Sequence, residues 1–272
     1  GTNASLGQIA IGRDALTAIT GGAGNVGVGY QTLLNSETGL HNTAIGYQAL
    51  LTDGTSTYDG DGNTAVGYQS LYFFDADADG HGGNTALGFS SGEFLSTGTS
   101  NTFLGWSAGQ GITGTKLAGN SNTAVGSHAG LVLQGAAHSN TLVGQAAGAA
   151  LTTGVKNVAI GTAAFDAADG TEEGNVAVGY EAMGSMDEQG NAVNQNVAIG
   201  QSALLGGAAT GNVLQNVAIG YNAMDGTGVN AQTGTVAVGA FALTALTSGT
   251  ENTAVGYQAL DGLVGGDKTT AI

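Results

Sequence analysis

The chain has 272 residues, of which 20 are acidic and only four are basic, so its formal net charge is −16. This balance argues against nucleic acid and anionic membranes as partners, because both bind basic patches. There is no cysteine, which excludes disulfides and thiol sites, and no apolar run long enough to span a bilayer. The 51 glycines do not recur at every third residue, which excludes a collagen triple helix.

A nine-residue phrase, Asn-Thr-Ala-Ile-Gly-Tyr-Gln-Ala-Leu, occupies residues 42–50 and returns with small changes at 63–71 and 252–260. Looser copies fill the rest of the chain, 17–21 residues apart. Their central glycines are Gly12, Gly29, Gly46, Gly67, Gly88, Gly105, Gly126, Gly144, Gly161, Gly179, Gly200, Gly220, Gly239 and Gly256. A short period held over a whole chain indicates a solenoid. We therefore predict an all-β fold: a parallel β-solenoid of about 14 coils forming one repetitive domain over residues 1–272.

The residues before each central glycine predict a short strand. The last of them is always Ile, Val or Leu, and Thr or Val usually lies two residues earlier. Alternating β-branched residues are typical of strands. We expect Ile45, Val66 and Leu87 to stack as a continuous aliphatic spine, and the exchange of Thr for Val favours an inward face. The alanine between them predicts a crowded face, against either another chain or another wall of the coil.

Two further positions predict turns. An asparagine opens most strands, and its side chain can cap a turn and form an amide ladder along the axis. The central glycine turns the corner where a Cβ would clash. A small and then an apolar residue follow, which predicts a second short strand, although glycine replaces the apolar residue in four consecutive coils. In three successive coils these structural residues are Asn42, Asn63, Asn84, Gly46, Gly67 and Gly88.

The phrase Asn-[Thr/Val]-Ala-[Ile/Val]-Gly-x-x-Ala resembles the head repeats of trimeric autotransporter adhesins, the YadA-like heads, and related repeats of phage tail fibres and bacterial surface proteins. Residues 159–161 and 198–200 carry it clearly. The resemblance implies a left-handed β-roll in which three chains associate, used for attachment at a cell or virion surface. The coils here are longer than those of that family, and many carry an aromatic residue after the glycine.

The most specific local motif is Asp75-Ala-Asp77-Ala-Asp79-Gly, which matches the first half of an EF-hand-type calcium loop. The glutamate that would close such a loop is absent, since Ala86 takes its place. One coil earlier lie Asp59 and Asp61, and stacking would bring both acidic loops together. The sequence leaves two interpretations open: a calcium site, or plain acidic surface loops.

The aromatic residues after the central glycines, including Tyr47, Tyr68, Phe89 and Trp106, form a predicted ladder. Such a ladder could stack on a host glycan, or its rings could cover the glycine corners and pack on one another.

No pattern assembles a nucleophile, a base and oxyanion donors, so we expect no enzyme. The sequence favours a non-catalytic structural or adhesive fibre that is extracellular, on a cell surface or on a virion. The alternatives are a phage tail-fibre shaft and the subunit of a head-to-tail filament. Both ends fall at one phase of the repeat, so the chain is expected to be either a segment of a longer fibre or such a filament subunit. We expect it to associate with copies of itself.

Overall fold

The computed structural model describes residues 7–51, 60–75, 82–187, 189–207, 210–226 and 230–272. These residues contain strands and turns but no helix, and the fold is the predicted parallel β-solenoid of about 14 coils. The chain divides into two compact units, Gly1–Ser139 and Asn140–Ile272.

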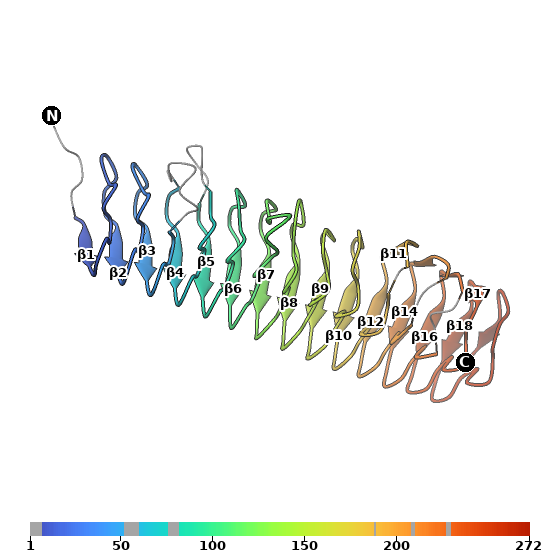
Figure 1. Cartoon of the computed structure of the whole chain (residues 1–272). Helices are drawn as coiled ribbons and strands as arrows, with labels where there is room; N and C mark the ends of the chain where they lie inside the picture. The colour runs from blue at the N-terminus through green and yellow to red at the C-terminus, as the bar shows by residue number, and fades with distance from the viewer. Residues whose placement is uncertain (1–6, 52–59, 76–81, 188, 208–209, 227–229) are drawn as a thin grey trace. The chain divides into compact units, whose positions relative to one another are not determined.

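In the first unit each coil contributes one three-residue strand, and successive strands pair in parallel (Figure 1). Ile45 is paired with Val66, and Val66 with Leu87, so the predicted stacking is confirmed. The strands are β1 (Ile9–Ile11), β2 (Val26–Val28), β3 (Thr43–Ile45), β4 (Thr64–Val66), β5 (Thr85–Leu87), β6 (Thr102–Leu104) and β7 (Thr123–Val125).

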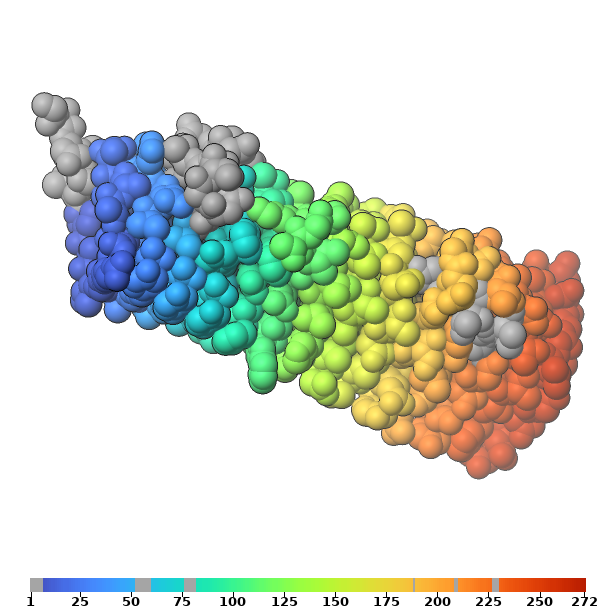
Figure 2. Space-filling model, in the orientation of Figure 1, coloured from blue at the N-terminus to red at the C-terminus, as the bar shows by residue number. Residues whose placement is uncertain are grey.

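The second unit repeats this arrangement and adds a second parallel sheet of four two-residue strands. The first sheet contains β8 (Thr141–Val143), β9 (Val158–Ile160), β10 (Val176–Val178), β12 (Val197–Ile199), β14 (Val217–Ile219), β16 (Val236–Val238), β18 (Thr253–Val255) and β19 (Thr270–Ala271). The second sheet contains β11 (Val193–Asn194), β13 (Val213–Leu214), β15 (Gln232–Thr233) and β17 (Gly249–Thr250). Within each unit, Figure 2 shows that residues close in space come from the same or neighbouring coils.

The sequence predicted that the aliphatic residues of each strand face the core, but in the structure the alanine between them does. The middle residues of the strands, such as Ala44, Ala65 and Ala86, are completely buried. The flanking residues face outward: Ile45 is 39% and Leu87 is 52% exposed. The expected inward face of the aliphatic spine is therefore wrong. In these coils the large residue four positions after the glycine fills the interior, so only a methyl group fits at mid-strand, and the crowded surface is another part of the same chain.

Larger side chains on the other walls fill the core. Leu33, Leu50 and Leu71, four residues after their central glycines, are completely buried. A second buried column lies seven residues after the glycine and includes Phe74 and Leu95. Sequence reasoning missed this second column, although most coils have an apolar residue seven positions after the glycine.

The segment after each glycine is a turn, so the second strand predicted there is wrong. Gln48 and Leu50 adopt left-handed backbone, with φ of 54° and 52°, and the equivalent residues of other coils do the same. Such a conformation is costly for residues with a Cβ. Hydrogen bonds between coils stabilise it: Gln48 N donates to Tyr30 O at 2.8 Å, and Leu50 N donates to Ser70 O at 3.0 Å.

The asparagines form the predicted ladder inside the solenoid. Asn84 is fully buried, and its Nδ2 donates to Asn63 Oδ1 at 3.1 Å and to Gly98 O at 2.9 Å. Its Oδ1 accepts the backbone N–H of Asn101 at 2.9 Å. Each amide thus bonds to the coils on both sides, which satisfies buried polar groups that would otherwise destabilise the fold.

Candidate functional site

The outward surface formed by the first and third residues of the three-residue strands is termed the strand face. It contains no ionisable residue in either unit. In the first unit it carries a column of half-exposed threonines beside the aliphatic column. In the second unit Ile160, Ile199 and Ile219 are exposed in the equivalent place. An uncharged apolar strip on so acidic a chain is a typical protein interaction surface.

A column of rings runs beside the strand face of the first unit. Its first four rings are nearly parallel, with centroid distances of 5.1 Å from Tyr30 to Tyr47, 5.2 Å from Tyr47 to Tyr68 and 4.9 Å from Tyr68 to Phe89. Arg13 lies over Tyr30 at 5.5 Å, which covers the first ring. The rings therefore pack on one another, as one of the two interpretations predicted, and the faces inside this stack are closed to a sugar.

The column changes its geometry at Trp106. Its indole is inclined by 69° to the Phe89 ring at a centroid distance of 6.0 Å, and it is 61% exposed. The following coil supplies Ser127, which has no ring, at the position after the glycine. The neighbouring His128 lies 5.8 Å from the indole and is tilted by 36°. The face of Trp106 is consequently less covered than the faces of the rings before it.

Of the predicted calcium ligands, Asp59, Asp77 and Asp79 lie outside the described residues. Asp61 Oδ1 accepts the backbone N–H of Leu40 at 2.7 Å, and Asp75 N donates to Ser96 O at 3.0 Å. The described residues contain no group of three or more His, Cys, Asp or Glu side chains placed to hold a metal ion. Calcium binding stays a prediction.

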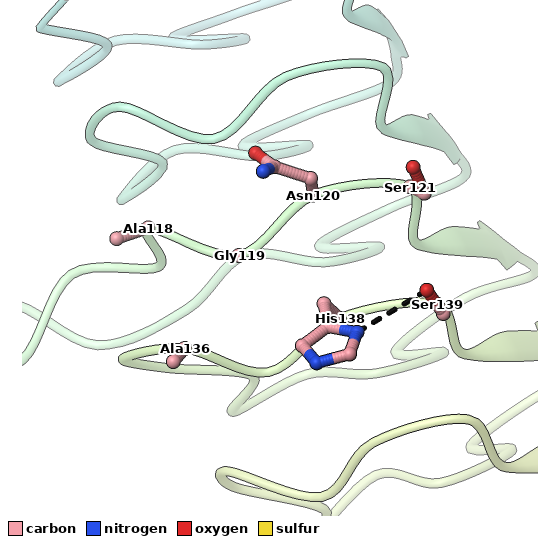
Figure 3. A pocket seen from close by; sticks show the side chains of 7 residues that line it. All are labelled: Ala118, Gly119, Asn120, Ser121, Ala136, His138 and Ser139. Atoms are coloured by element: carbon pink, nitrogen blue, oxygen red, sulfur yellow. Dashed lines mark hydrogen bonds between the residues drawn. The ribbon is translucent and has the colours of Figure 1, made fainter.

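A surface cavity of about 390 Å³ lies between two neighbouring loops of the first unit. In Figure 3 the segments 118–121 and 136–139 run side by side and carry the amide of Asn120 and the ring of His138, which both line the cavity. His138 Nδ1 and Ser139 Oγ are 3.2 Å apart. Its lining combines the polar side chains of Asn120, Ser121, His138 and Ser139 with Ala118, Gly119 and Ala136. Nothing in the spacing of these residues along the sequence indicated it.

Two carboxyl groups of the second unit have altered acidity. Burial raises the pKa of Asp166, backbone hydrogen bonding partly opposes this, and the charge of Glu181 raises it further. Burial also raises the pKa of Asp225, while the hydrogen bond from Asn222 at 2.8 Å opposes it. Tyr180 donates a hydrogen bond to Glu181, which raises the pKa of this exposed phenol. The raised pKa values of Asp166, Asp225 and Tyr180 are thus explained by burial and by the neighbouring residues of each group.

Sequence reasoning missed two features of this surface. It placed the strand face in the core, although the lack of any charge there and the small residue between its columns were visible. It also did not predict that Trp106 would lie beside Ser127 and His128. The signal for this arrangement is Ser127, which replaces an aromatic residue at the position after the glycine.

The described residues form no helix with the length and hydropathy needed to span a bilayer. Comparisons with protein-family models, curated proteins and solved structures find no match for this chain.

Proposed function

We propose that this chain is a non-catalytic structural or adhesive element of an extracellular fibre, which associates laterally with copies of itself through the strand face. The observation that carries the proposal is the continuous uncharged column containing Ile45, Val66 and Leu87 on the outside of a coil. Burying such a column stabilises an assembly by roughly 25 cal/mol per Å² of apolar surface removed from water.

Charge supports a second copy as the occupant of this face. Two chains that each carry a net charge of −16 repel one another wherever their acidic loops meet. The strand face is free of ionisable residues, so two copies can approach there without burying an unpaired charge. Lateral association would add buried apolar area to the core that each chain already has.

Three copies, exposure at a cell or virion surface, and an adhesive role follow from the resemblance of the repeat to autotransporter heads. A structural role agrees with the uniformity of the coils, which repeat one packing pattern instead of building a single specialised site. A β-solenoid presents the same surface again in each successive coil.

The test is the mass of the native assembly, measured by sedimentation and native mass spectrometry, for the wild type and for Ile45→Lys/Leu87→Lys. We expect a discrete oligomer, three copies being the favoured number, that dissociates in the double variant. Both side chains are exposed within one chain, so the variant monomer should retain its circular dichroism spectrum and stay folded.

Ser121→Lys is the matched control, because the equivalent position in another coil is Lys156 with the same left-handed backbone. It adds a cation away from the strand face and should leave the oligomer intact. A wild type that is monomeric at all concentrations would contradict the proposal. Electron micrographs showing chains joined only end to end would support the head-to-tail filament instead.

A further inference from the structure

We propose that Trp106, Ser127 and His128 form a binding site for one pyranose ring of a neutral glycan. This inference rests on the adhesive role proposed above and gives it a ligand class and a location. It narrows the ladder of Tyr47, Tyr68, Phe89 and Trp106 to its last member, Trp106, since the other three rings are stacked on one another.

Ring orientation distinguishes Trp106 from the rings before it. A pyranose stacks through its C–H groups, which carry partial positive charge, on the electron-rich face of an aromatic ring. Between Tyr30 and Phe89 the rings lie about 5 Å apart and nearly parallel, so each interior face already has a partner. The indole of Trp106 is turned by 69° from the Phe89 ring, so it points a face sideways from the column.

Polar groups beside the indole complete the site. Ser127 Oγ and His128 Nδ1 are 2.8 Å apart, and this contact fixes the orientation of the imidazole. Within the described part of the chain, His128 Nε2 and the indole N–H of Trp106 have no hydrogen-bond partner. Both can therefore bond to sugar hydroxyls, and an aromatic platform with a few convergent polar groups is typical of ligand sites.

The local charge favours a neutral sugar over an organic cation. A cation site would place a carboxylate near the ring, but the residues that follow the central glycines of this coil and the two adjacent coils are, besides Trp106, Phe89, Ser90, Ser107, Ser127 and His128, none of them acidic. The rigid turn also supports the site: Ser107 and His128 both have left-handed backbone held by hydrogen bonds between coils.

The experiment uses the emission of Trp106, the only tryptophan in the chain. The full chain is titrated with cellohexaose, maltohexaose and chitohexaose, and separately with choline as a cationic probe. We expect saturable quenching or a shift to shorter wavelength with at least one hexasaccharide and none with choline. By calorimetry with that sugar, Trp106→Ala should weaken binding by roughly tenfold or more, and His128→Ala by a smaller factor.

Tyr47→Ala is the matched control, because it removes an exposed ring of the closed stack and should leave sugar affinity unchanged. The proposal is overturned if no hexasaccharide alters the emission, if only choline does, or if Tyr47→Ala weakens binding as much as Trp106→Ala. A shift that depends on protein concentration without sugar would assign Trp106 to contact between copies. The mass of the oligomer is measured in parallel and tests the proposed lateral association separately from the sugar site.

Discussion

The ring of Phe103 occupies the space that a side chain at position 109 would need. A Cβ built on Gly109 would overlap the ring at Cδ1 and Cε1, and one built on Gly92 would lie 2.8 Å from its Cδ2. Most coils have alanine in mid-strand and a large residue four positions after the glycine, whereas this coil reverses the two sizes. Leu142 and Gly148 repeat the exchange, since a Cβ on Gly148 would lie 2.8 Å from Leu142 Cδ2.

This exchange of sizes predicts that a substitution at residue 109 can restore the stability lost by a substitution at residue 103. Phe103→Ala should lower the free energy of unfolding by about 3–5 kcal/mol, because it leaves a cavity in a packed core. Gly109→Leu alone should also destabilise, by about 1–3 kcal/mol, through overpacking. The double variant restores the common pattern and should be more stable than either single variant, with a coupling of about 0.5–3 kcal/mol. Urea unfolding of all four proteins measures it; strictly additive losses would contradict the exchange.

The central glycines are predicted to tolerate alanine only where the next coil is absent. At Gly67 the backbone has φ of 137°, and a Cβ would overlap the carbonyl oxygen of Gly88. Gly256 has a similar φ of 128°, but a Cβ added there would have no atom within 4 Å. Gly256→Ala should therefore cost only the backbone strain, about 1–3 kcal/mol, and Gly67→Ala clearly more. Thermal melting of both variants compares them, and equal losses would mean that strain alone explains the glycines.

The asparagine ladder has a weak point at Thr235, which takes the place of an asparagine. Its Oγ1 accepts the N–H of Asn252 at a long 3.4 Å, while Asn84 makes the equivalent bond at 2.9 Å. We expect Thr235→Asn to stabilise the chain by about 0.5–1.5 kcal/mol, because the amide adds donors toward Asn216 Oδ1 and Gly249 O. The converse change, Asn84→Thr, should destabilise. Denaturant unfolding gives both values, and a loss of stability in Thr235→Asn would count against the ladder.

Asp166 gives a prediction for pH. Its pKa is raised in the folded chain, mainly by burial, so the folded state binds the proton more tightly than the unfolded state. The resulting stabilisation is present below the ordinary pKa of 3.8 and is lost as the pH rises through the higher folded value. Asp166→Asn should therefore raise the melting temperature more at pH 7 than at pH 3.5, relative to the wild type. An equal effect at both values would show that the carboxyl is not perturbed.

Calcium is tested by its removal. If the acidic loops around Asp61 and Asp75 hold Ca²⁺, dialysis against EDTA should lower the melting temperature and added Ca²⁺ should restore it, because a ligand of the folded state stabilises it. Mg²⁺ at the same concentration is the control for simple screening. An unchanged transition after chelation would leave plain acidic loops as the interpretation.

The sequence was sufficient to predict the solenoid, its strands and the roles of Gly46 and Asn42, because every coil must satisfy the same steric and hydrogen-bonding demands. It misplaced Ile45 and Val66, since hydrophobic periodicity identifies an apolar column but does not say whether the column faces the core or a partner. The width of the coil decides which side of the strand faces the core. An alanine in mid-strand indicates a narrow interior only when the residues of the opposite wall are known.

The surface features were less predictable for a physical reason. Whether a ring stacks on its neighbour or turns outward depends on the residue in the next coil, as with Trp106 and Ser127. Such contacts join residues 17–21 positions apart, and the interval varies with the loops. The left-handed turns at Gln48 and Leu50 were hidden for a related reason, because hydrogen bonds between coils override the preferences of those residues.

The ladder bonds of Asn157 run to the neighbouring coils: its N–H and Nδ2 donate to Asn140 Oδ1, and its Oδ1 accepts the N–H of Asn175. If residues 157–174, one whole period, were removed, Asn175 would take the place of Asn157 beside Asn140 in the asparagine ladder. Every coil would then still stack on a coil of the same pattern. A deletion that is a few residues shorter than one period would shift the asparagine, glycine and aliphatic columns out of register together. Evolution can therefore lengthen or shorten this molecule in whole steps without redesigning its interior, and the same rule tells an engineer where to cut.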